Sequence, residues 1–498
     1  MSAVASLPPI QVEADGSPLA APGLSALSHV RVHQRLGAPA LCELTFHPGP
    51  SLDLTTLPAL GGALRVALAA DGSELFSGDV TAIEHVHGPD GERAILVRGY
   101  DPLRRLRSTQ HLRSQPGATL GDVAGELAGP TGLSVEPPDA GISWVRLLQL
   151  GESDLELLVR LAERTGVFAT AQDGALRFLT LEGDGEPLAL ALGETLLEAR
   201  VELNADRASS SVTATGWNPV DAEPHTSTAS EPRLRRSTRA GSDLGEALVV
   251  DEMLPDDDHA AALAQAELDV RAAREVTFWG VADGDPRLRP GAVVEVSGLG
   301  ENADGAHVLT EIRHTIDERR GFVSELSTAP PEPHARQRAT VATLGEVTSV
   351  SDPDDRGRVQ VRLTGYGDVE TDWLGVVVPG AGQDKGLIAL PDVGDTVLVV
   401  LPRGDGQGVV VGGLYGKTAP PDAGVDAGAV RRYTLRTPAG QVITLDDVAK
   451  KLRLEDETGS YVELTPQKVV VHAAVDLAIE APGRAVTVTG NTIDFKRG

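Results

Sequence analysis

The sequence has very little cysteine and few aromatic residues. Its single cysteine, Cys42, excludes an intrachain disulfide. No catalytic motif surrounds this thiol, so we interpret Cys42 as a small buried hydrophobic side chain rather than a nucleophile. Aromatic residues make up only 3% of the chain, although 41% of it is hydrophobic. The cores must therefore be built from valine, leucine, isoleucine and alanine.

Long apolar runs are also missing. The first residues, MSAVASLPPIQVEADG, have neither a basic start nor an apolar core of signal-peptide length. No run of about 18 apolar residues occurs, so no membrane-spanning helix is expected. We therefore expect a protein without a signal peptide that is made and assembled in the cytoplasm.

Basic residues are outnumbered by acidic ones, 44 to 72, which gives a net charge of −28. Such a surface repels nucleic acid phosphates and anionic lipids, so no nucleic-acid partner is expected. The most basic segment is RLRRSTR, Arg233 to Arg239, within a polar, proline-rich stretch over about 219–245. We interpret it as a mobile loop with scattered charge rather than a binding arm.

What the sequence does contain is a dense pattern of short alternating segments separated by turns. The 55 glycines and 33 prolines show no collagen-like period and favour many turns between strands. Within residues 1 to about 100, HVRVHQRL, ALRVALAA and AILVRGY alternate with period two, and DGSELFSGDVTAIEHV is interpreted as a hairpin opened by Asp-Gly. The fold class is therefore mainly β.

A few short helices interrupt the strands. Thr119 with Asp122, and Ser153 with Glu156, have the spacing of capping boxes, in which each side chain satisfies an amide of the first turn. A third helix, alanine-rich and preceded by acidic residues, is expected over about 257–273. The remainder of the first part of the chain is expected to form strands and loops.

Two proline-rich segments divide the chain, whose 498 residues suggest about three domains. The stretch APPEPHARQR separates a large first domain, 1–335, from a compact β-domain, 340–416. Five or six short strands in this second domain fit a small barrel. A second linker, 417–430, precedes a last segment, 431–498, with a different texture.

The last segment is a ladder of short alternating strands: QVITLDD, KLRLED, YVELT, VVVHA, DLAIEA, AVTVTG and TIDF. Apolar anchors recur every 7–10 residues, a short period typical of β-helices and solenoids. The anchors are Leu445, Leu454, Leu464, Val471, Ile479, Val488 and Phe495.

One chain alone would leave these narrow apolar faces exposed and the strand edges unpaired. Three chains wound together would bury the anchors on a shared axis, at ~1.5–3 kcal/mol for each fully buried side chain. The residues expected to point outward are polar: Thr444, Arg453, Glu463, Asp476 and Thr487. The segment therefore predicts a triple-stranded β-helix in a homotrimer.

Four motifs in order carry a family resemblance. GYDPLRRL (Gly99 to Leu106) and LGESDLELLVRLAERTG (Leu150 to Gly166) resemble stretches of VgrG-type spike proteins and phage late-control D proteins, with Leu157 where phenylalanine is usual. GRVQVRL, DWLGVVVPGAG, IALPDVGDTVLVVLPRGD and VVVGGLYG resemble the OB-fold block of that family, with Leu374-Gly375 in place of Arg-Val and Leu401 in place of Phe. TPAGQVITLDD resembles the start of its β-helix.

The resemblance implies a fold and an assembly. The expected parts are a hub of two tube-like β-barrels, an OB-fold neck and a triple-stranded β-helix needle. Such a spike joins a hexameric inner tube protein and baseplate proteins to a PAAR-type tip protein, expected here at Ile493 and Phe495, and it admits effector cargo. It contacts a target membrane only transiently, as a mechanical puncturing device. Because the chain ends after the last rung without a fused effector, it resembles extracellular phage-tail-like particles more than type VI secretion spikes.

The short motifs that resemble binding sites are incomplete. Gly416-Lys417-Thr418 resembles the end of a phosphate-binding loop, but Val411 stands where that loop needs glycine. Asp352, Asp354 and Asp355 are grouped, but the later glutamate of a calcium-binding EF-hand loop is missing. We interpret the first as a loop and the second as a turn between strands.

His85 and His87 share a strand face, yet no cysteine or carboxylate pattern completes a metal site. Glu152 and Asp154 lie at a helix start, where capping explains them. HExxH, GxSxG and Cys-x-x-Cys are absent. We therefore expect no enzyme, no cofactor and no metal.

Two other functions are compatible with a β-solenoid: an adhesive or polysaccharide-active tail protein, and a hydrolase with an unrecognised site. A sugar-binding ladder should carry aromatic platforms, and this one has only Tyr433, Tyr461 and Phe495. An activity screen on peptidoglycan and glycans separates these functions from a mechanical spike.

Overall fold

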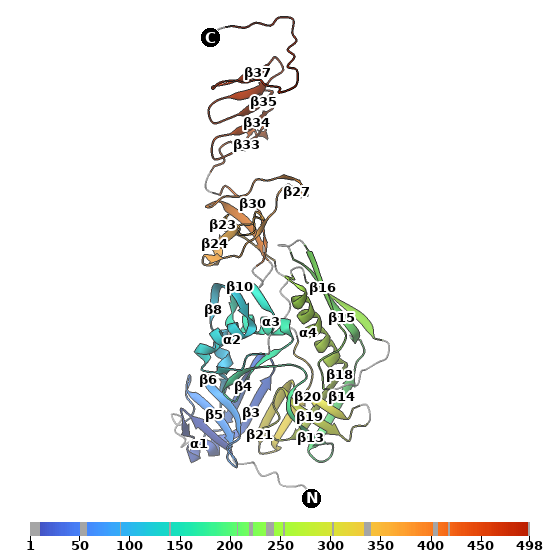
Figure 1. Cartoon of the computed structure of the whole chain (residues 1–498). Helices are drawn as coiled ribbons and strands as arrows, with labels where there is room; N and C mark the ends of the chain where they lie inside the picture. The colour runs from blue at the N-terminus through green and yellow to red at the C-terminus, as the bar shows by residue number, and fades with distance from the viewer. Residues whose placement is uncertain are drawn as a thin grey trace. The chain divides into compact units, whose positions relative to one another are not determined.

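The computed structural model divides the chain into two compact units, Met1–Leu414 and Tyr415–Gly498, and each is described by itself (Figure 1). Among the described residues, no helix is long and apolar enough to cross a membrane. The structure describes residues 10–49, 57–89, 91–138, 141–206, 208–218, 223–235, 244–251, 254–300, 303–332, 340–401, 407–416 and 419–496.

The hub of the first unit is built on an eleven-stranded sheet in the order β14-β18-β22-β21-β3-β4-β7-β6-β5-β1-β2. All neighbouring strands in it are antiparallel. The strands are β1 (Ile10–Ala14), β2 (Ser17–Pro18), β3 (Leu27–Arg35), β4 (Ala38–Phe46), β5 (Ala63–Leu68), β6 (Glu74–His87), β7 (Arg93–Tyr100), β14 (Leu196–Leu203), β18 (Val276–Asp283), β21 (Glu311–Asp317) and β22 (Gly321–Ser327).

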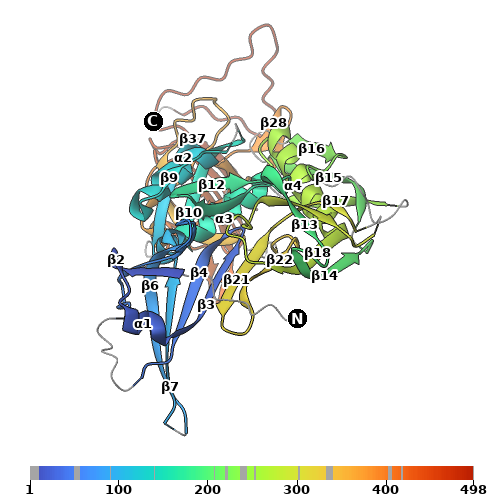
Figure 2. The same ribbon diagram turned by 90° about the horizontal axis from the view of Figure 1, so that it is seen from below.

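This sheet has two halves that meet where β3 pairs with β21 (Figure 2). The first half covers a core that contains Leu44 and Val97, while the second covers a separate core around Phe278. A three-stranded sheet, β13-β19-β20, closes the second core. Its strands are β13 (Asp184–Ala191), β19 (Ala292–Ser297) and β20 (Gly305–Val308). The predicted tandem β-hub is confirmed in this doubled arrangement.

The segment predicted as a hairpin in the first half is a single strand. β6 runs through Glu74–His87 and pairs with β5 on one side and β7 on the other. Asp71 and Gly72 do turn the chain, but they join β5 to β6 rather than opening a hairpin inside β6. A register shift between Val80 and Ala82 lets β6 pass both partners without a turn.

Along the chain, a helical layer with its own core comes between the two halves of the sheet. The capping boxes predicted at Thr119 and Ser153 are both formed, and Gly166 closes α3 in a left-handed conformation with φ 73°. The predicted third helix is confirmed as α4, which begins after the N-cap Asp256. The elements are α1 (Ala21–Ala26), which was not predicted, α2 (Leu120–Ala128), α3 (Asp154–Thr165), α4 (Asp257–Glu275), β8 (Gln110–Thr119), β9 (Ser134–Val135), β10 (Ser143–Ser153), β11 (Phe168–Gln172) and β12 (Ala175–Leu179), with 3-10 turns Pro102–Arg107 and Gly129–Thr131.

Helix α4 packs against a sheet in the order β16-β15-β17 (Figure 1). Its strands are β15 (Ser209–Asn218), β16 (Glu223–Ala229) and β17 (Gly245–Asp251). Strand β16 lies in the stretch predicted as a polar loop, so that prediction was wrong there. The cause is cross-strand pairing, because hydroxyls of Thr213 and Thr215 on β15 bond those of Thr228 and Thr226 at 2.9 and 2.8 Å.

The rest of the first unit is a small barrel, as predicted, with sheet order β25-β24-β23-β29-β30-β26. A bridge joins Val359, next to β24, to Leu374, next to β26 at the far end of this order. Val361 and Val399 lie in the fully buried core of the barrel. Its elements are β23 (Val341–Ser349), β24 (Gln360–Leu363), a 3-10 turn (Thr364–Tyr366), β25 (Val369–Glu370), β26 (Gly375–Val376), β27 (Gly380–Gly382), β28 (Lys385–Leu387), β29 (Thr396–Leu401) and β30 (Val409–Gly413).

The second unit holds a five-stranded antiparallel sheet in chain order. A two-residue hairpin, β31 with β32, lies in the predicted second linker. The strands are β31 (Val425–Asp426), β32 (Ala429–Val430), β33 (Arg432–Arg436), β34 (Val442–Asp446), β35 (Lys451–Glu455), β36 (Tyr461–Leu464) and β37 (Val469–His472). The segments DLAIEA, AVTVTG and TIDF, predicted as strands, are not strands here, because a strand needs a partner to pair with and the described residues 473–496 find none within this chain.

Candidate interaction surfaces

Strand register divides the sheet of the second unit into an apolar and a polar face. Residues directly opposite one another in an antiparallel pair share a face, as do residues two apart on one strand. Leu445 pairs with Leu452, and Leu452 in turn with Leu464. The whole set on this apolar face is Tyr433, Leu435, Ile443, Leu445, Leu452, Leu454, Val462, Leu464, Val469 and Val471.

Four of the seven predicted anchors are on the apolar face: Leu445, Leu454, Leu464 and Val471. Sequence reasoning took one anchor per strand, whereas the register gives two. Most missed residues stand two positions from an anchor or opposite one, whereas Leu435 stands two positions from Tyr433 on β33, a strand without a predicted anchor. This period-two signal was available in the sequence.

The opposite face is polar, and the predicted outward residues Thr444, Arg453 and Glu463 lie on it. Arg453 bonds Glu455 at 2.9 and 3.0 Å and Glu463 at 3.2 Å. Its guanidinium also lies 3.8 Å from the ring centre of Tyr461, which covers that aromatic side chain. The charged side chains at the centre of this face are therefore paired with one another, which suits contact with water.

The apolar face is open to solvent in the single chain. Leu454 is 52% exposed and Val471 61% exposed. The three remaining anchors, Ile479, Val488 and Phe495, and the expected tip residue Ile493 are exposed as well. A contiguous exposed apolar surface of this kind marks an interaction site in a stable protein.

The chain just before this sheet is fixed by a carboxylate clamp. Asp422 accepts two hydrogen bonds from Arg432, both 2.6 Å, one from Thr434 Oγ1 at 2.7 Å and one from the Gly424 amide at 2.9 Å. These donors, the Arg432 guanidinium first, hold the pKa of Asp422 well below its usual range. The clamp ties the hairpin β31–β32 to the first strand of the sheet.

A second surface joins the hub to the OB barrel inside the first unit. Strands β8 and β10 form a two-stranded antiparallel sheet, although α2 and β9 lie between them in the chain. We call this strand pair the β8–β10 hairpin, and it has two faces. Leu148 and Leu150 point to the barrel, where Leu148 is part of the buried core and Leu150 packs against it. Arg146 lies 3.9 Å from Asp372 of the barrel. Leu112 shares this face by register with Leu150.

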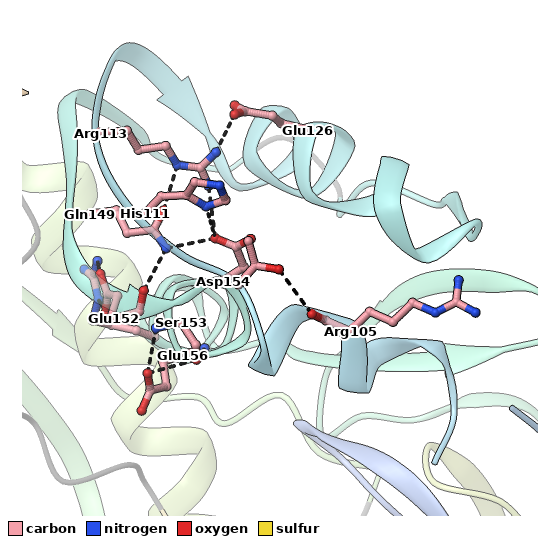
Figure 3. A network of polar contacts seen from close by, with 11 residues as sticks. Arg105, His111, Arg113, Glu126, Gln149, Glu152, Ser153, Asp154 and Glu156 are labelled. Carbon is pink, nitrogen blue, oxygen red and sulfur yellow. Dashed lines mark hydrogen bonds and ion pairs between the residues drawn. The ribbon is translucent and has the colours of Figure 1, made fainter. Parts of the chain in front are cut away.

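The other face of the hairpin holds a polar network around the buried side chains of Gln149 and Asp154 (Figure 3). Gln149 Nε2 donates to Asp154 Oδ1 at 2.9 Å, and His111 Nδ1 lies 3.0 Å from the same oxygen. Arg113 Nε donates to Gln149 Oε1 at 2.7 Å, and its guanidinium also pairs with Glu126. Asp154 is thus held by side chains of both strands at the first turn of α3.

This arrangement corrects the interpretation of Glu152 and Asp154 as capping residues. The capping is done by Ser153 and Glu156, whose side chain and amide groups bond reciprocally. Glu152 instead pairs with Arg160 at 2.7 Å, while Asp154 is buried in the network. The sequence signal for the helix start was right, but it could not show which carboxylate faces inward.

The remaining sequence candidates do not form a common site. Cys42 is fully buried, and burial raises the pKa of its thiol, as expected for a small core residue. Strand β6 carries His85 and His87 at an exposed end. Among the described residues, no group of three or more histidine, cysteine, aspartate or glutamate side chains could hold a metal ion.

The aspartates before the second strand of the barrel are engaged by an arginine. Arg358 bonds Asp352 at 2.6 and 3.0 Å and Asp354 at 2.6 Å, and the Arg358 bond lowers the pKa of Asp352. Asp355 has the positive φ, 54°, of a turn residue. The predicted turn is therefore present.

The basic segment at Arg233 is only partly within the described residues. Arg233 bonds the buried Asp269 of α4 through its backbone amide and its Nε, both at 2.8 Å, so this arginine is anchored rather than mobile. Residues 236–239 lie outside the described residues, as do Lys417 and Thr418 of the phosphate-loop candidate.

Two family models match the chain. The model of the Alg8 N-terminal domain matches residues 67–318, half of the chain. That of the Type VI secretion system/phage-baseplate injector OB domain matches residues 343–415. No curated protein sequence matches.

Solved structures share the fold at low identity. The E. coli c3393 protein, a component of the type VI secretion system similar to T4 tail proteins gp27 and gp5, is 14% identical over 80% of this chain and 99% of its own, with a TM-score of 0.54. A Francisella PdpA-VgrG complex is 10% identical over 93% and 87%, with a TM-score of 0.55. The 43 kDa tail protein of prophage MuSo2 from Shewanella oneidensis is 18% identical over 64% and 97%, with a TM-score of 0.50. The chain belongs to the Alg8 N-terminal domain family, and it has the fold of VgrG-like spike proteins with their phage-baseplate injector OB domain.

Proposed function

We propose that the chain is the central spike of a contractile injection system and works as a homotrimer. The observation that carries this proposal is the exposed apolar face of the sheet β33–β37. Since nine of the ten side chains on that face are aliphatic and the tenth is Tyr433, water is an unfavourable neighbour for most of the surface. Three copies with these faces turned to a shared axis would bury them together.

The other face of the same sheet is polar, as the exterior of such a trimer must be. The paired side chains of Arg453, Glu455 and Glu463 lie on the face that would point outward. The segment 473–496 adds exposed apolar side chains without strands of its own, so neighbouring chains would supply the missing pairing partners. Burial of each side chain contributes ~1.5–3 kcal/mol, which is enough for a stable stalk.

Partners of the spike follow from its proposed place in the particle. The doubled hub of the trimer would present six similar sheet units to a hexameric inner tube protein, with baseplate proteins around it. The far end, with Ile493 and Phe495, would carry a PAAR-type tip protein, and effector cargo could travel with the spike. We place the protein in the injection particle after cytoplasmic assembly, and favour the extracellular phage-tail-like type.

The proposed action is mechanical rather than catalytic. Contraction would drive the tube, and a stiff needle would concentrate the force on a small area of the target membrane. The net charge of −28 does not favour lasting adhesion to anionic lipid, so contact with the membrane would be transient.

The test is the mass of the full-length protein in solution, measured by light scattering. Three chains of 52.0 kDa give about 156 kDa. A well-folded species of 52.0 kDa at micromolar concentration would contradict the proposal.

A further inference from the structure

Leu148 of the hub lies inside the hydrophobic core of the OB barrel. It is 1% exposed and clusters with Val361 and Val399 of the barrel, more than two hundred residues further along the chain. We infer that the OB barrel has no complete core of its own, and that the β8–β10 hairpin of the hub is a structural part of it.

The alternation of β10 explains how one strand serves two cores. Leu147 belongs to the helical core of the hub, whereas the next residue, Leu148, belongs to the core of the barrel. Gln149 turns back to the hub network, and Leu150 again packs on the barrel. The hairpin is thus a shared wall with one face for each domain.

Contacts within the hub alone hold the hub-facing side of this wall in place. The carboxylate of Asp154 at the start of α3 accepts from Gln149 on β10 and lies 3.0 Å from His111 on β8 (Figure 3). Arg113 connects Gln149 to Glu126 of α2. Both strands are therefore fixed to helices, so that Leu148 and Leu150 are presented in a defined orientation.

Contacts at the margin of the shared wall agree with this inference. Leu112 packs against Gly367 of the barrel, where an added Cβ would lie 3.1 Å from Leu112 Cδ1. Arg146 donates to Ser114 Oγ at 2.9 Å and lies 3.9 Å from Asp372.

The motif from Leu150 to Gly166 gains a physical role from this geometry. Its Asp154 holds the hairpin, and the hairpin completes the next domain. The inference goes beyond the proposed spike function, because every contact in it lies within a single chain. Its failure would leave the trimer proposal intact, and a monomeric protein would leave the shared wall intact.

Hydrogen exchange of the full-length protein, followed by mass spectrometry, tests the inference. Leu148→Ala should accelerate exchange in barrel strands β23 and β29 on the order of tenfold or more, since it opens a cavity in their core. Leu147→Ala is the matched control. This neighbour is equally buried, at 2%, but it faces the hub, so its effect should be confined to α2, α3 and β10.

A milder variant covers the case in which Leu148→Ala does not fold. Leu150 is only partly buried, so Leu150→Ala should leave the chain folded and still accelerate exchange in β23 and β29 relative to Leu147→Ala. Barrel exchange that is the same in Leu150→Ala and Leu147→Ala would overturn the inference, as would unchanged barrel exchange in a folded Leu148→Ala protein.

Discussion

Gln149 and Asp154 are joined by a 2.9 Å hydrogen bond that links a strand of the hub hairpin to the first turn of α3. Both residues are buried, at 1% and 3% exposure, so this bond helps to satisfy both the amide and the carboxylate. Through this bond, the acidic motif at the start of α3 holds strand β10, whose Leu148 lies in the core of the barrel.

Asp154→Ala should destabilise the hub by on the order of 2 kcal/mol, because one N–H of the buried Gln149 amide loses its acceptor, while the other still donates to the Glu152 carbonyl. Asp258→Ala is a matched control, since Asp258 is an exposed acidic residue in the first turn of α4 and its loss should cost at most about 1 kcal/mol. Chemical denaturation followed by circular dichroism compares the two. Equal midpoints would show that Asp154 acts only through the helix dipole.

His314 predicts a pH dependence of stability. Nε2 donates to the Leu288 carbonyl at 3.0 Å and Nδ1 accepts from Ser324 Oγ at 2.8 Å, and burial lowers the pKa of His314 from 6.5 to about 4. The unfolded chain therefore takes up a proton before the folded one does as pH falls. The contribution of neutral His314 to the free energy of unfolding is fully present above pH 6.5. It is lost between pH 6.5 and about 4, by about 3 kcal/mol in all.

The comparison of wild type with His314→Gln isolates this effect. A glutamine stays neutral and can still donate and accept, so the slope of unfolding free energy between pH 6.5 and 4 should decrease in the variant. Asp101 acts in the opposite sense, because burial raises its pKa to about 7, but it is present in both proteins and cancels. Parallel pH profiles would mean that His314 titrates normally.

Sequence reasoning succeeded where the signals are local. The capping boxes at Thr119 and Ser153 and the helix after Asp256 depend on neighbours within a few residues, and all formed. Strand β16 was missed because the threonines that bond it lie on another strand. The inward turn of Asp154 and the position of Leu148 in a distant core depend on long-range packing, which has no signature in a local window.

The strands predicted after residue 430 show what the sequence pattern can and cannot predict. Period-two alternation correctly separated Leu445 from Thr444, but it also predicted strands beyond His472 that the single chain does not form. Alternation records which side chains prefer to be buried. It does not record whether the partner strand belongs to the same chain, and that question needs experiments on assembly.

Leu445→Asp should prevent trimer formation. On the proposed axis it would bury three carboxylates close together, at a cost of several kcal/mol in each chain. Thr444→Asp is the matched control, because Thr444 is the adjacent residue on the polar face of β34 and its cross-strand neighbour is Arg453. Light scattering should give a monomer for the first variant and a trimer for the second. If both variants form trimers, the apolar face does not lie on the trimer axis.

Ile479→Asp tests the strand-free segment by the same logic. Ile479 is 72% exposed in the single chain, and it lies after the last strand of the sheet, so the substitution should not disturb the fold of one copy. If neighbouring chains bury this side chain, the charge should lower the thermal stability of the trimer and abolish intact, contracting particles. Thr487→Asp, an expected outward position in the same segment, should leave both properties close to wild type. Intact particles that still contract with Ile479→Asp would show that Ile479 does not point to the axis, because a buried ring of three carboxylates could not persist there.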